Sequence, residues 1–305
     1  MKVFTVATRG TDLAIAQTKI VIAALKSRNP DIEFEIKRIA AQGDRNQRTV
    51  LWDLKSTGFF TSQVEEALIS RQADFAVHSF KDLPTKQHKG LRIAAVCRRE
   101  FPEDCVVTAK ATASIAALEQ GARIGTSSLR RAVQIKRLRK DVEIVPIRGN
   151  VPTRIKLVEQ GKYDAVILAR AGLERLGLGG KIAFSLPPAQ FIPAPAQGAL
   201  AVQIRLEDDN INGLVSAIDH KETRDIVCAE RKILSATQCG CHAPVGAFAK
   251  IDGDSIIIDA FISDLKGEKF IRRQIKGIIS ENEKLAEALA KELLDAGGKE
   301  ILENL

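Results

Sequence analysis

The sequence predicts an α/β protein, with two similar doubly wound α/β domains flanking a cleft and a smaller α+β third domain. Through the first two-thirds of the chain, short apolar segments alternate with amphipathic ones, which is typical of parallel sheets covered by helices on both faces. The segment ATRGT at residues 7–11 is echoed by IGTSS at residues 124–128, which indicates two related domains. After residue 245 the pattern changes to strands joined by short turns, as in a hairpin meander.

Prolines mark the connection that follows the second domain. Pro187, Pro188, Pro193 and Pro195 stiffen this segment, and residues 199–205 are expected to form a strand that returns to the first sheet. We therefore expect residues 1–97 with 199–217 to form the first domain, residues 102–194 the second and residues 219–305 the third.

In the first domain, apolar periodicity predicts strands and helices in turn. Ser62 and Glu65 are spaced as a capping box for one helix. Residues 41–60 have no clear period, as in a functional lid, a binding loop or a disordered segment. The expected strands are residues 3–7, 33–39, 74–77 and 91–96, and the expected helices are residues 13–28 and 62–71.

The second and third domains follow the same kind of analysis. Pro152 falls in the first turn of a helix, where proline is tolerated, and Ser280 is expected to cap a last helix that ends at Gly297-Gly298. The expected strands are residues 105–108, 123–125, 142–147, 163–169, 245–250, 255–263 and 269–276. The expected helices are residues 129–140, 151–160, 171–176, 210–218 and 222–236.

Composition narrows the function classes. The 305 residues are 45% hydrophobic, and no apolar run approaches the roughly 20 residues of a membrane span. The N-terminus lacks the apolar core and cleavage site of a signal peptide, so we expect a cytoplasmic protein. The net charge of +8 predicts an anionic partner. With 12 Phe, one Trp and one Tyr, the chain is poor in the stacking platforms of single-strand binders.

The segment QCGCHAPVG at residues 238–246 places a thiol in a turn, because Gly240 permits positive φ and Pro244 forbids helix. A loop cysteine such as Cys241 is structural or incidental unless its surroundings are electropositive and accessible. The five scattered cysteines argue against a disulfide framework. Cys239, Cys241 and His242 lack the second ligand cluster of a structural zinc site, so no metal is expected.

Polar and charged residues gather at expected strand ends. Ser79, Lys81 and Asp82 follow a buried strand, at the edge where ligands bind in open α/β sheets. Arg130 and Arg131 occupy a helix first turn, where the dipole disfavours cations, and we interpret this cost as the sign of an anionic ligand. The basic run at residues 136–140 is instead typical of a solvated or nucleic-acid-binding face. Asp82 fits either a salt-bridged loop residue or an acid/base or cation-stabilising group.

Five segments resemble signatures of the porphobilinogen deaminase family, also called hydroxymethylbilane synthases. They are VHSFKDLP at residues 77–84, GTSSLRR at 125–131, RGNVPTR at 148–154, PAQGA at 195–199 and GCHAPVG at 240–246. The similarity extends from about Val3 to the C-terminal helix.

The resemblance implies a three-domain transferase that joins four porphobilinogen molecules head to tail and releases ammonia at each step. It also implies a dipyrromethane primer attached through a thioether to Cys241, with Asp82 as the catalytic aspartate. Each pyrrole carries acetate and propionate groups, which would explain an arginine-rich cleft, and an ionised aspartate could stabilise the azafulvene cation left by ammonia. We expect a cytoplasmic monomer that binds porphobilinogen, without a nucleic-acid or membrane partner.

The resemblance also implies a set of residues at or beside the binding positions for primer and substrate. They are Arg9, Thr11, Asp44, Phe60, Ser79, Lys81, Thr126, Ser128, Arg130, Arg131, Arg148, Arg154, Arg175 and Gln197. The sequence departs from the family pattern in the loop KSTGFF at residues 55–60, at Cys239 in place of a glycine, at Gln203 in place of a glutamate, and at Arg170 in place of an apolar residue.

Two other functions use the same features. A two-lobed solute-binding protein for a carboxylate or phosphate would share the strand–helix pattern, but it has no need of Cys241 or of the third domain. An RNA-binding protein would use the face at residues 136–140, and its affinity would fall steeply with salt.

Overall fold

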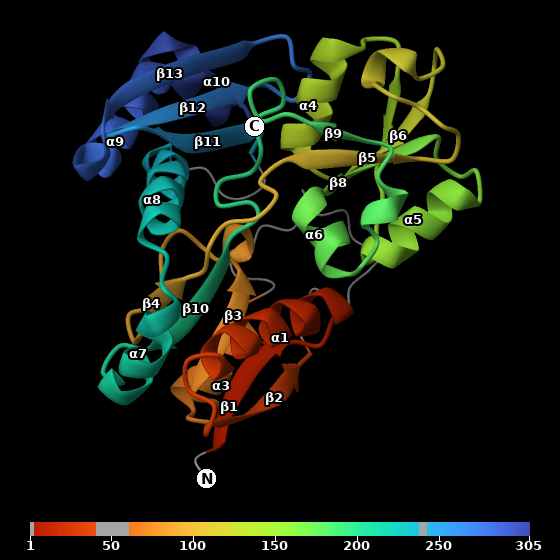
Figure 1. The fold of residues 1–305 in the computed structure, drawn as a ribbon. Helices are drawn as coiled ribbons and strands as arrows, with labels where there is room; N and C mark the ends of the chain where they lie inside the picture. Colours follow the sequence, from red (N-terminus) through yellow and green to blue (C-terminus); the bar gives the residue numbers. More distant parts are fainter. Residues whose placement is uncertain (1–2, 41–60, 238–242) are drawn as a thin grey trace. The chain divides into compact units, whose positions relative to one another are not determined.

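The computed structural model describes residues 3–40, 61–237 and 243–305. The described chain divides into two compact units. The first holds residues 3–40, 61–100 and 198–224, and the second holds residues 101–197, 225–237 and 243–305. The described residues form three separate sheets, two of five strands and one of three (Figure 1). The predicted fold class is therefore confirmed, while the boundaries of the three expected domains stay a prediction.

The first unit contains a five-stranded sheet with the order β2-β1-β3-β10-β4. β1 runs parallel to β2 and β3, whereas β10 runs antiparallel to both of its neighbours. The returning strand was expected, but its direction makes the sheet mixed where we predicted a parallel one. The strands are β1 (Val3–Arg9), β2 (Glu33–Ile39), β3 (Phe75–Ser79), β4 (Leu91–Val96) and β10 (Leu200–Arg205). The helices are α1 (Asp12–Lys26), α3 (Ser62–Ile69) and α7 (Asp209–Val215).

Neighbouring residues on one strand show that this sheet is covered on both faces. Phe75 packs in one apolar core with Val21 of α1, whereas the next residue, Ala76, packs in a second core with Val64 of α3. Successive side chains of a strand point to opposite faces, so α1 and α3 cover opposite faces, as a doubly wound sheet requires.

The start of α3 corrects the predicted capping box. The N-cap is Thr61, one residue earlier than the predicted Ser62, and its side chain makes no capping hydrogen bond. The Glu65 N–H donates to the Thr61 carbonyl at 2.9 Å, and the Ser62 hydroxyl turns to Gln63. The helix thus begins without the reciprocal side-chain bonds of a capping box.

The second unit repeats the arrangement with the order β7-β6-β8-β5-β9. β6 runs parallel to β7 and β8, and β5 runs antiparallel to β8 and β9. The antiparallel strand again occupies the fourth position, and β6, like β1, occupies the second. The similar segments at residues 7–11 and 124–128 therefore lie at the ends of equivalent strands. The strands are β5 (Asp104–Thr108), β6 (Arg123–Gly125), β7 (Glu143–Val145), β8 (Ala165–Ala169) and β9 (Phe184–Leu186). The helices are α4 (Leu129–Leu138), α5 (Val151–Glu159) and α6 (Arg170–Arg175).

The mixed sheets have a topological cause. A parallel neighbour needs a crossover connection, usually a helix, between two strands. β5 and β10 instead each follow a connection that enters their unit from the other unit, at residues 100–101 and 197–198, and no helix of the described chain lies between that connection and the strand. Periodicity within one strand–helix pair contains no information about this direction.

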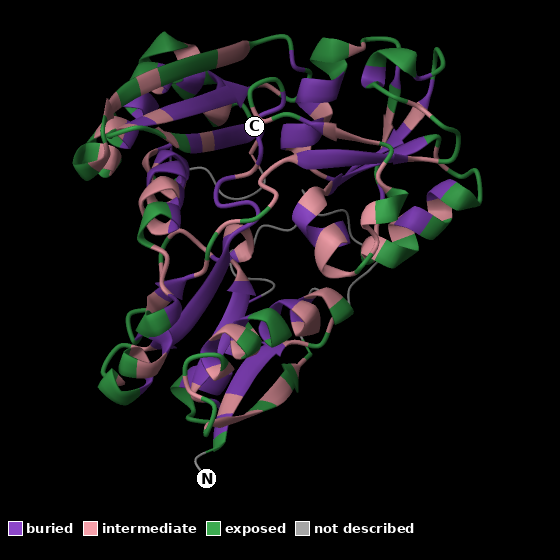
Figure 2. Cartoon of the chain, viewed as in Figure 1, coloured by how far each residue is buried: buried purple, intermediate pink, exposed green. Residues whose placement is uncertain are grey.

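The third sheet is an antiparallel meander of β11 (Val245–Asp252), β12 (Ser255–Ser263) and β13 (Phe270–Ile278). Its apolar face packs against α8 (Lys221–Ala236) and α9 (Asn282–Leu293), and Figure 2 shows buried stretches along β11 and β12. This confirms the expected hairpin pattern of the third part.

The C-terminal helix differs from its prediction at its start. Ser280 lies inside a 3₁₀ turn, and α9 begins after Glu281. The predicted break at Gly297-Gly298 is present, because Gly297 takes a non-helical φ of 106°, and a separate short helix, α10 (Lys299–Glu303), follows it. Ile301 of α10 packs in the core of the third sheet, so burial accounts for this additional helix.

Candidate functional site

Four of the predicted site residues in the first unit line one hollow. Arg9 ends β1, Thr11 caps α1, Ser79 ends β3, and Asp82 lies in the 3₁₀ turn Phe80–Asp82 that follows. β1 and β3 are parallel neighbours, so their carboxyl ends meet at one edge of the sheet. The prediction that ligand-binding residues gather at this edge agrees with the geometry.

Side-chain contacts hold the wall of this hollow in place. The Gln17 amide donates to the Ser79 hydroxyl at 2.8 Å and accepts from it at 3.1 Å. The Thr11 hydroxyl accepts from the Ala14 N–H at 3.3 Å, which caps α1. Gln17 lines the hollow, but sequence reasoning missed it, because a polar residue inside an amphipathic helix has no signal that separates it from a surface residue.

His78 also lines the hollow, beside Ser79 and Asp82. Burial lowers the pKa of His78 from 6.5 to about 4, and the positive charge of Arg9 acts in the same direction. The ring is therefore neutral at physiological pH, so Asp82 has no histidine cation beside it. Sequence reasoning missed this residue as well, since one histidine in an apolar strand resembles an ordinary core histidine.

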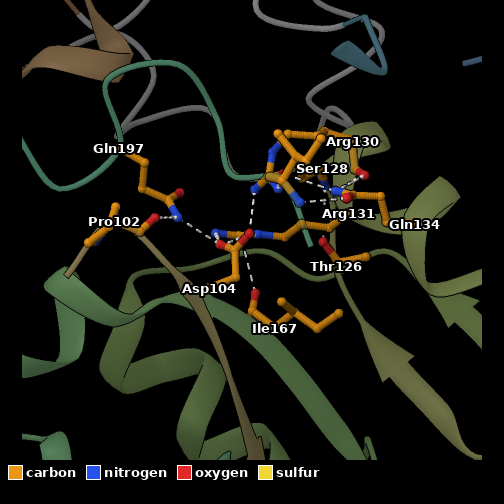
Figure 3. A network of polar contacts seen from close by, with 10 residues as sticks. Pro102, Asp104, Thr126, Ser128, Arg130, Arg131, Gln134, Ile167 and Gln197 are labelled. Carbon is orange, nitrogen blue, oxygen red and sulfur yellow. Dashed lines mark hydrogen bonds and ion pairs between the residues drawn. The ribbon is translucent and has the colours of Figure 1, made fainter. Parts of the chain in front are cut away.

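In the second unit, a buried carboxylate holds the first-turn arginines of α4 (Figure 3). Asp104 Oδ2 lies 2.8 Å from Arg130 Nη2, and Asp104 Oδ1 lies 2.7 Å from Arg131 Nη2. Asp104 is completely buried, and both arginines are at most 7% exposed. Our interpretation of these cations is corrected accordingly: an internal anion, Asp104, offsets their cost at the helix terminus. One carboxylate against two guanidinium groups still leaves a net positive charge.

Gln197 belongs to the same cluster and is fully buried. Its amide nitrogen donates to the Pro102 carbonyl at 2.8 Å and to Asp104 Oδ1 at 3.1 Å. The predicted binding residue thus supports Asp104 from inside the protein. Thr126 is buried as well, and its hydroxyl accepts from the Ser128 N–H at 3.2 Å, so the GTSS turn is held by its own side chains.

Arg148 and Arg154 lie in a different electrostatic setting. Arg154 is placed by the turn before α5, where its Nε donates to the Gly149 carbonyl at 2.8 Å. Burial, together with the positive charges of Arg131 and Arg148, lowers the pKa of Arg154 to about 10. The three cations are therefore close enough to repel one another. Within residues 3–40, 61–237 and 243–305, neither Arg148 nor Arg154 has an acidic partner within 4.0 Å.

Arg148 also has donors that are left over. Its Nε and Nη2 atoms are buried and have no hydrogen-bond partner in the described part of the chain. Buried donors without acceptors are costly, and burial lowers the pKa of Arg148. A carboxylate is the group that such a guanidinium recognises best, through two parallel hydrogen bonds.

The remaining predicted residues are less informative. Lys81 is half-buried in the turn with Asp82, and Arg175 is half-buried at the end of α6. Asp44, Phe60, Cys239 and Cys241 lie outside the described residues. In the part of the chain that is described, no group of three metal-ligating side chains is present, and no helix is long and apolar enough to cross a membrane.

The basic run at residues 136–140 is partly engaged within the protein. The Arg137 guanidinium lies over the Phe270 ring at 4.4 Å. Arg139 bonds to Asp141 at 2.7 Å and to the Ile115 carbonyl at 2.9 Å. Both side chains have partners within the protein, while Lys136, Arg137 and Lys140 remain exposed on this face.

Known proteins of one family match nearly the full length of this chain. Residues 4–213 match the family model of the porphobilinogen deaminase dipyromethane cofactor binding domain, and residues 225–295 match the porphobilinogen deaminase C-terminal domain. The porphobilinogen deaminase of Thermus thermophilus is 43% identical over 99% of both chains. That of Desulforudis audaxviator is 41% identical over 97% of this chain and 96% of the other. That of Deinococcus radiodurans is 39% identical over 99% of both. The chain belongs to the porphobilinogen deaminase family.

Proposed function

We propose that this chain joins four porphobilinogen molecules head to tail on a covalently held dipyrromethane primer and releases hydroxymethylbilane, with loss of ammonia at each addition. The observation that supports this most is the hollow of the first unit, where Asp82 lies with Arg9, Thr11 and Ser79. A carboxylate would weaken a site that only binds anions, whereas it stabilises a cation that forms during a reaction.

Asp82 acts in this proposal as an electrostatic and hydrogen-bonding group. Its carboxylate accepts hydrogen bonds from pyrrole N–H groups and stabilises the positive charge that develops on the substrate as ammonia leaves. The neutral His78 ring adds no competing positive charge. Arg9, Lys81, Ser79 and Thr11 supply donors that bind and orient the substrate's carboxylates.

The arginines of the second unit suit the carboxylates of a dipyrromethane. The buried donors of Arg148 that have no acceptor in the described residues fit an acetate or propionate side chain. We assign the binding of substrate, primer and growing-chain carboxylates to the arginines of this unit, and the thioether attachment to Cys241. These arginines are Arg130, Arg131, Arg148, Arg154 and Arg175. When bound, the primer supplies the nucleophilic pyrrole carbon.

The other assignments follow from family membership and the sequence. Asp44, Phe60, Thr126, Ser128 and Gln197 complete the proposed binding set. We also propose a cytoplasmic monomer of three domains, formed by residues 1–97 with 199–217, 102–194 and 219–305, without a nucleic-acid partner.

The intact mass of the purified protein tests this proposal. It should exceed the sequence mass by two linked pyrrole units, and the protein should convert porphobilinogen to hydroxymethylbilane. Cys241→Ser should lose the added mass and the activity, whereas Cys239→Ser, the matched control two residues away, should keep both. An unmodified wild-type mass, or the reverse result for the two cysteines, would contradict the assignment.

A further inference from the structure

A continuous series of buried polar contacts runs through the second unit. Asp104 binds the guanidinium groups of Arg130 and Arg131, and Gln197 donates to Asp104 at 3.1 Å. The far sides of the arginines are also fixed, because Arg130 Nη1 donates to the Ile192 carbonyl at 2.7 Å and Arg131 Nη1 donates to the Ile167 carbonyl at 3.0 Å. Each guanidinium thus has a defined orientation (Figure 3).

The series continues through the residue before Gln197. Ala196 has φ of 61°, in the left-handed region that residues with a Cβ rarely adopt. Its N–H donates to Glu230 Oε2 at 2.7 Å. A non-glycine residue persists in this conformation only where the surroundings hold it, and Glu230 is the group that holds this turn.

Glu230 lies on α8 and is completely buried. Its second oxygen, Oε1, accepts from the Ala249 N–H of β11 at 2.7 Å. One carboxylate therefore fastens the turn that carries Gln197 to both the helix and the first strand of the third sheet. α8 ends at Ala236, shortly before Cys241 in the sequence.

We propose that Asp104, Gln197 and Glu230 are positioning residues, which act through Arg130 and Arg131 by fixing their guanidinium groups relative to α8. This rests on the proposed function, in which these arginines bind the carboxylates of substrate and growing chain. The network makes the position of the arginines depend on α8, the helix that precedes Cys241 in the sequence.

Because Asp104 is negatively charged, its substitution changes carboxylate binding in opposite directions through charge and through position. Asp104→Asn removes one negative charge, so charge alone would strengthen carboxylate binding. Loss of position has the opposite effect, because a misaligned guanidinium cannot make two parallel hydrogen bonds. A purely structural role would lower the amount of folded enzyme, which lowers kcat and leaves KM unchanged.

The experiment compares holoenzymes of wild type, Asp104→Asn, Gln197→Met and Glu230→Gln, with Asp141→Asn as the matched control for an ion pair outside the network. We expect KM for porphobilinogen to rise about tenfold in Asp104→Asn and about threefold in the other two, with kcat changing less and the control unchanged. Gln197→Met and Glu230→Gln retain both arginine–aspartate pairs, so they remain informative where Asp104→Asn does not fold. An unchanged KM in these variants, or a lower KM in Asp104→Asn, would overturn the proposal.

Two further measurements separate this proposal from the proposed function. In a double-mutant cycle, the effect of Asp104→Asn should shrink in an Arg131→Lys background, because both changes act through one group; additive effects would contradict the coupling. The Nε–H resonance of Arg131, followed by NMR with labelled arginine, should shift or broaden in Gln197→Met and Glu230→Gln. This readout does not need turnover: an inactive, unprimed wild type would refute the proposed function, and an unmoved resonance would refute the positioning role.

Discussion

The two five-stranded sheets share one strand order, yet the equivalent turns at their strand ends differ in charge. In the first unit, β1 leads through Thr11 into α1, whose first turn contains Asp12, a favourable charge at a helix N-terminus. In the second unit, β6 leads into α4, whose first turn contains Arg130 and Arg131. That turn is stable because Asp104, completely buried, offsets the charges that the dipole disfavours.

Under the proposed function, this difference corresponds to different roles for two sheets of the same topology. The first sheet presents a carboxylate and a neutral histidine in a hollow, which suits stabilisation of a cation. The second sheet collects cations in excess of its one buried carboxylate, which suits the binding of carboxylates. Substitutions in either sheet can test this difference, because the first sheet is expected to stabilise a cation and the second to bind carboxylates.

The largest effect is expected from Asp82→Asn, which keeps the shape of the side chain and removes its charge. Loss of a preorganised electrostatic contact costs about 2.7–4 kcal/mol, or roughly 10²–10³ in rate. Asp82→Glu keeps the charge one methylene away and should retain more activity. The measurement is single-turnover addition of porphobilinogen to variants loaded with preformed primer. Addition at the wild-type rate by Asp82→Asn would identify Asp82 as a structural salt-bridge residue.

His78 predicts a pH dependence of stability. Its pKa is about 4 in the folded protein against 6.5 for the ordinary side chain, so between these values the unfolded chain binds a proton that the folded chain does not. The stabilising effect is complete above pH 6.5 and is lost as pH falls toward 4, by roughly 3 kcal/mol.

Thermal unfolding of wild type and His78→Gln between pH 7 and 4 measures this effect. The wild type should lose more stability on acidification than the variant does. His88→Gln is the matched control, since that ring is exposed. Parallel pH profiles for wild type and His78→Gln would show that the ring does not stay neutral in the hollow.

Substitutions of arginines in the second unit should affect activity and melting temperature differently. Arg148→Leu removes a cation without an acidic partner in the described residues, so it should weaken binding or elongation about ten- to a hundredfold, as expected for a charge-assisted bond of roughly 1.5–3 kcal/mol. Its melting temperature should not fall, because the repulsion on Arg154 is relieved.

Arg131→Leu is the counterpart for the compensated pair. It leaves Asp104 with one of its two cations, so it should lower the melting temperature and also stall the enzyme with a short chain or without primer. Calorimetry and the masses of enzyme–substrate intermediates measure both effects. Normal elongation and an unchanged salt response in both leucine variants would refute carboxylate binding at this edge.

The comparison also explains what the sequence can and cannot predict. Apolar periodicity predicted most strands and helices, and the echo around Thr8 and Thr126 predicted the related sheets. The reversed direction of β5 and β10 depends on how the chain crosses between units, which no local pattern contains. The cap of α3 was misplaced by one residue, to the buried Thr61. The extra helix α10 was not expected, because it depends on the burial of Ile301 against a distant sheet.

For the site, the position of Ser79 and Asp82 after a buried strand and the family resemblance that implied Arg9 agree with the hollow that these three residues line. The role of Asp104 could not be predicted, because its importance lies in long-range pairs with Arg130 and Arg131. His78 and Glu230 were missed for the same reason: each matters through burial and partners distant in the sequence. At residues 136–140 the local charge pattern indicated a solvated or nucleic-acid-binding face, but Arg137 and Arg139 have partners within the protein.

The smallest effect is expected at that run, from Arg137→Ala. The guanidinium over Phe270 joins α4 to β13, and a cation–π contact at an exposed position contributes about 0.5–1 kcal/mol. The melting temperature should therefore fall by about 2 °C, whereas turnover and KM should not change. Lys136→Ala, on the same helix and exposed, should change neither. Because Arg137 stands two turns beyond the arginines that Asp104 holds, a tenfold rise in KM would extend the carboxylate-binding surface along α4. Salt-sensitive RNA binding lost in both variants would instead revive the nucleic-acid interpretation of this face.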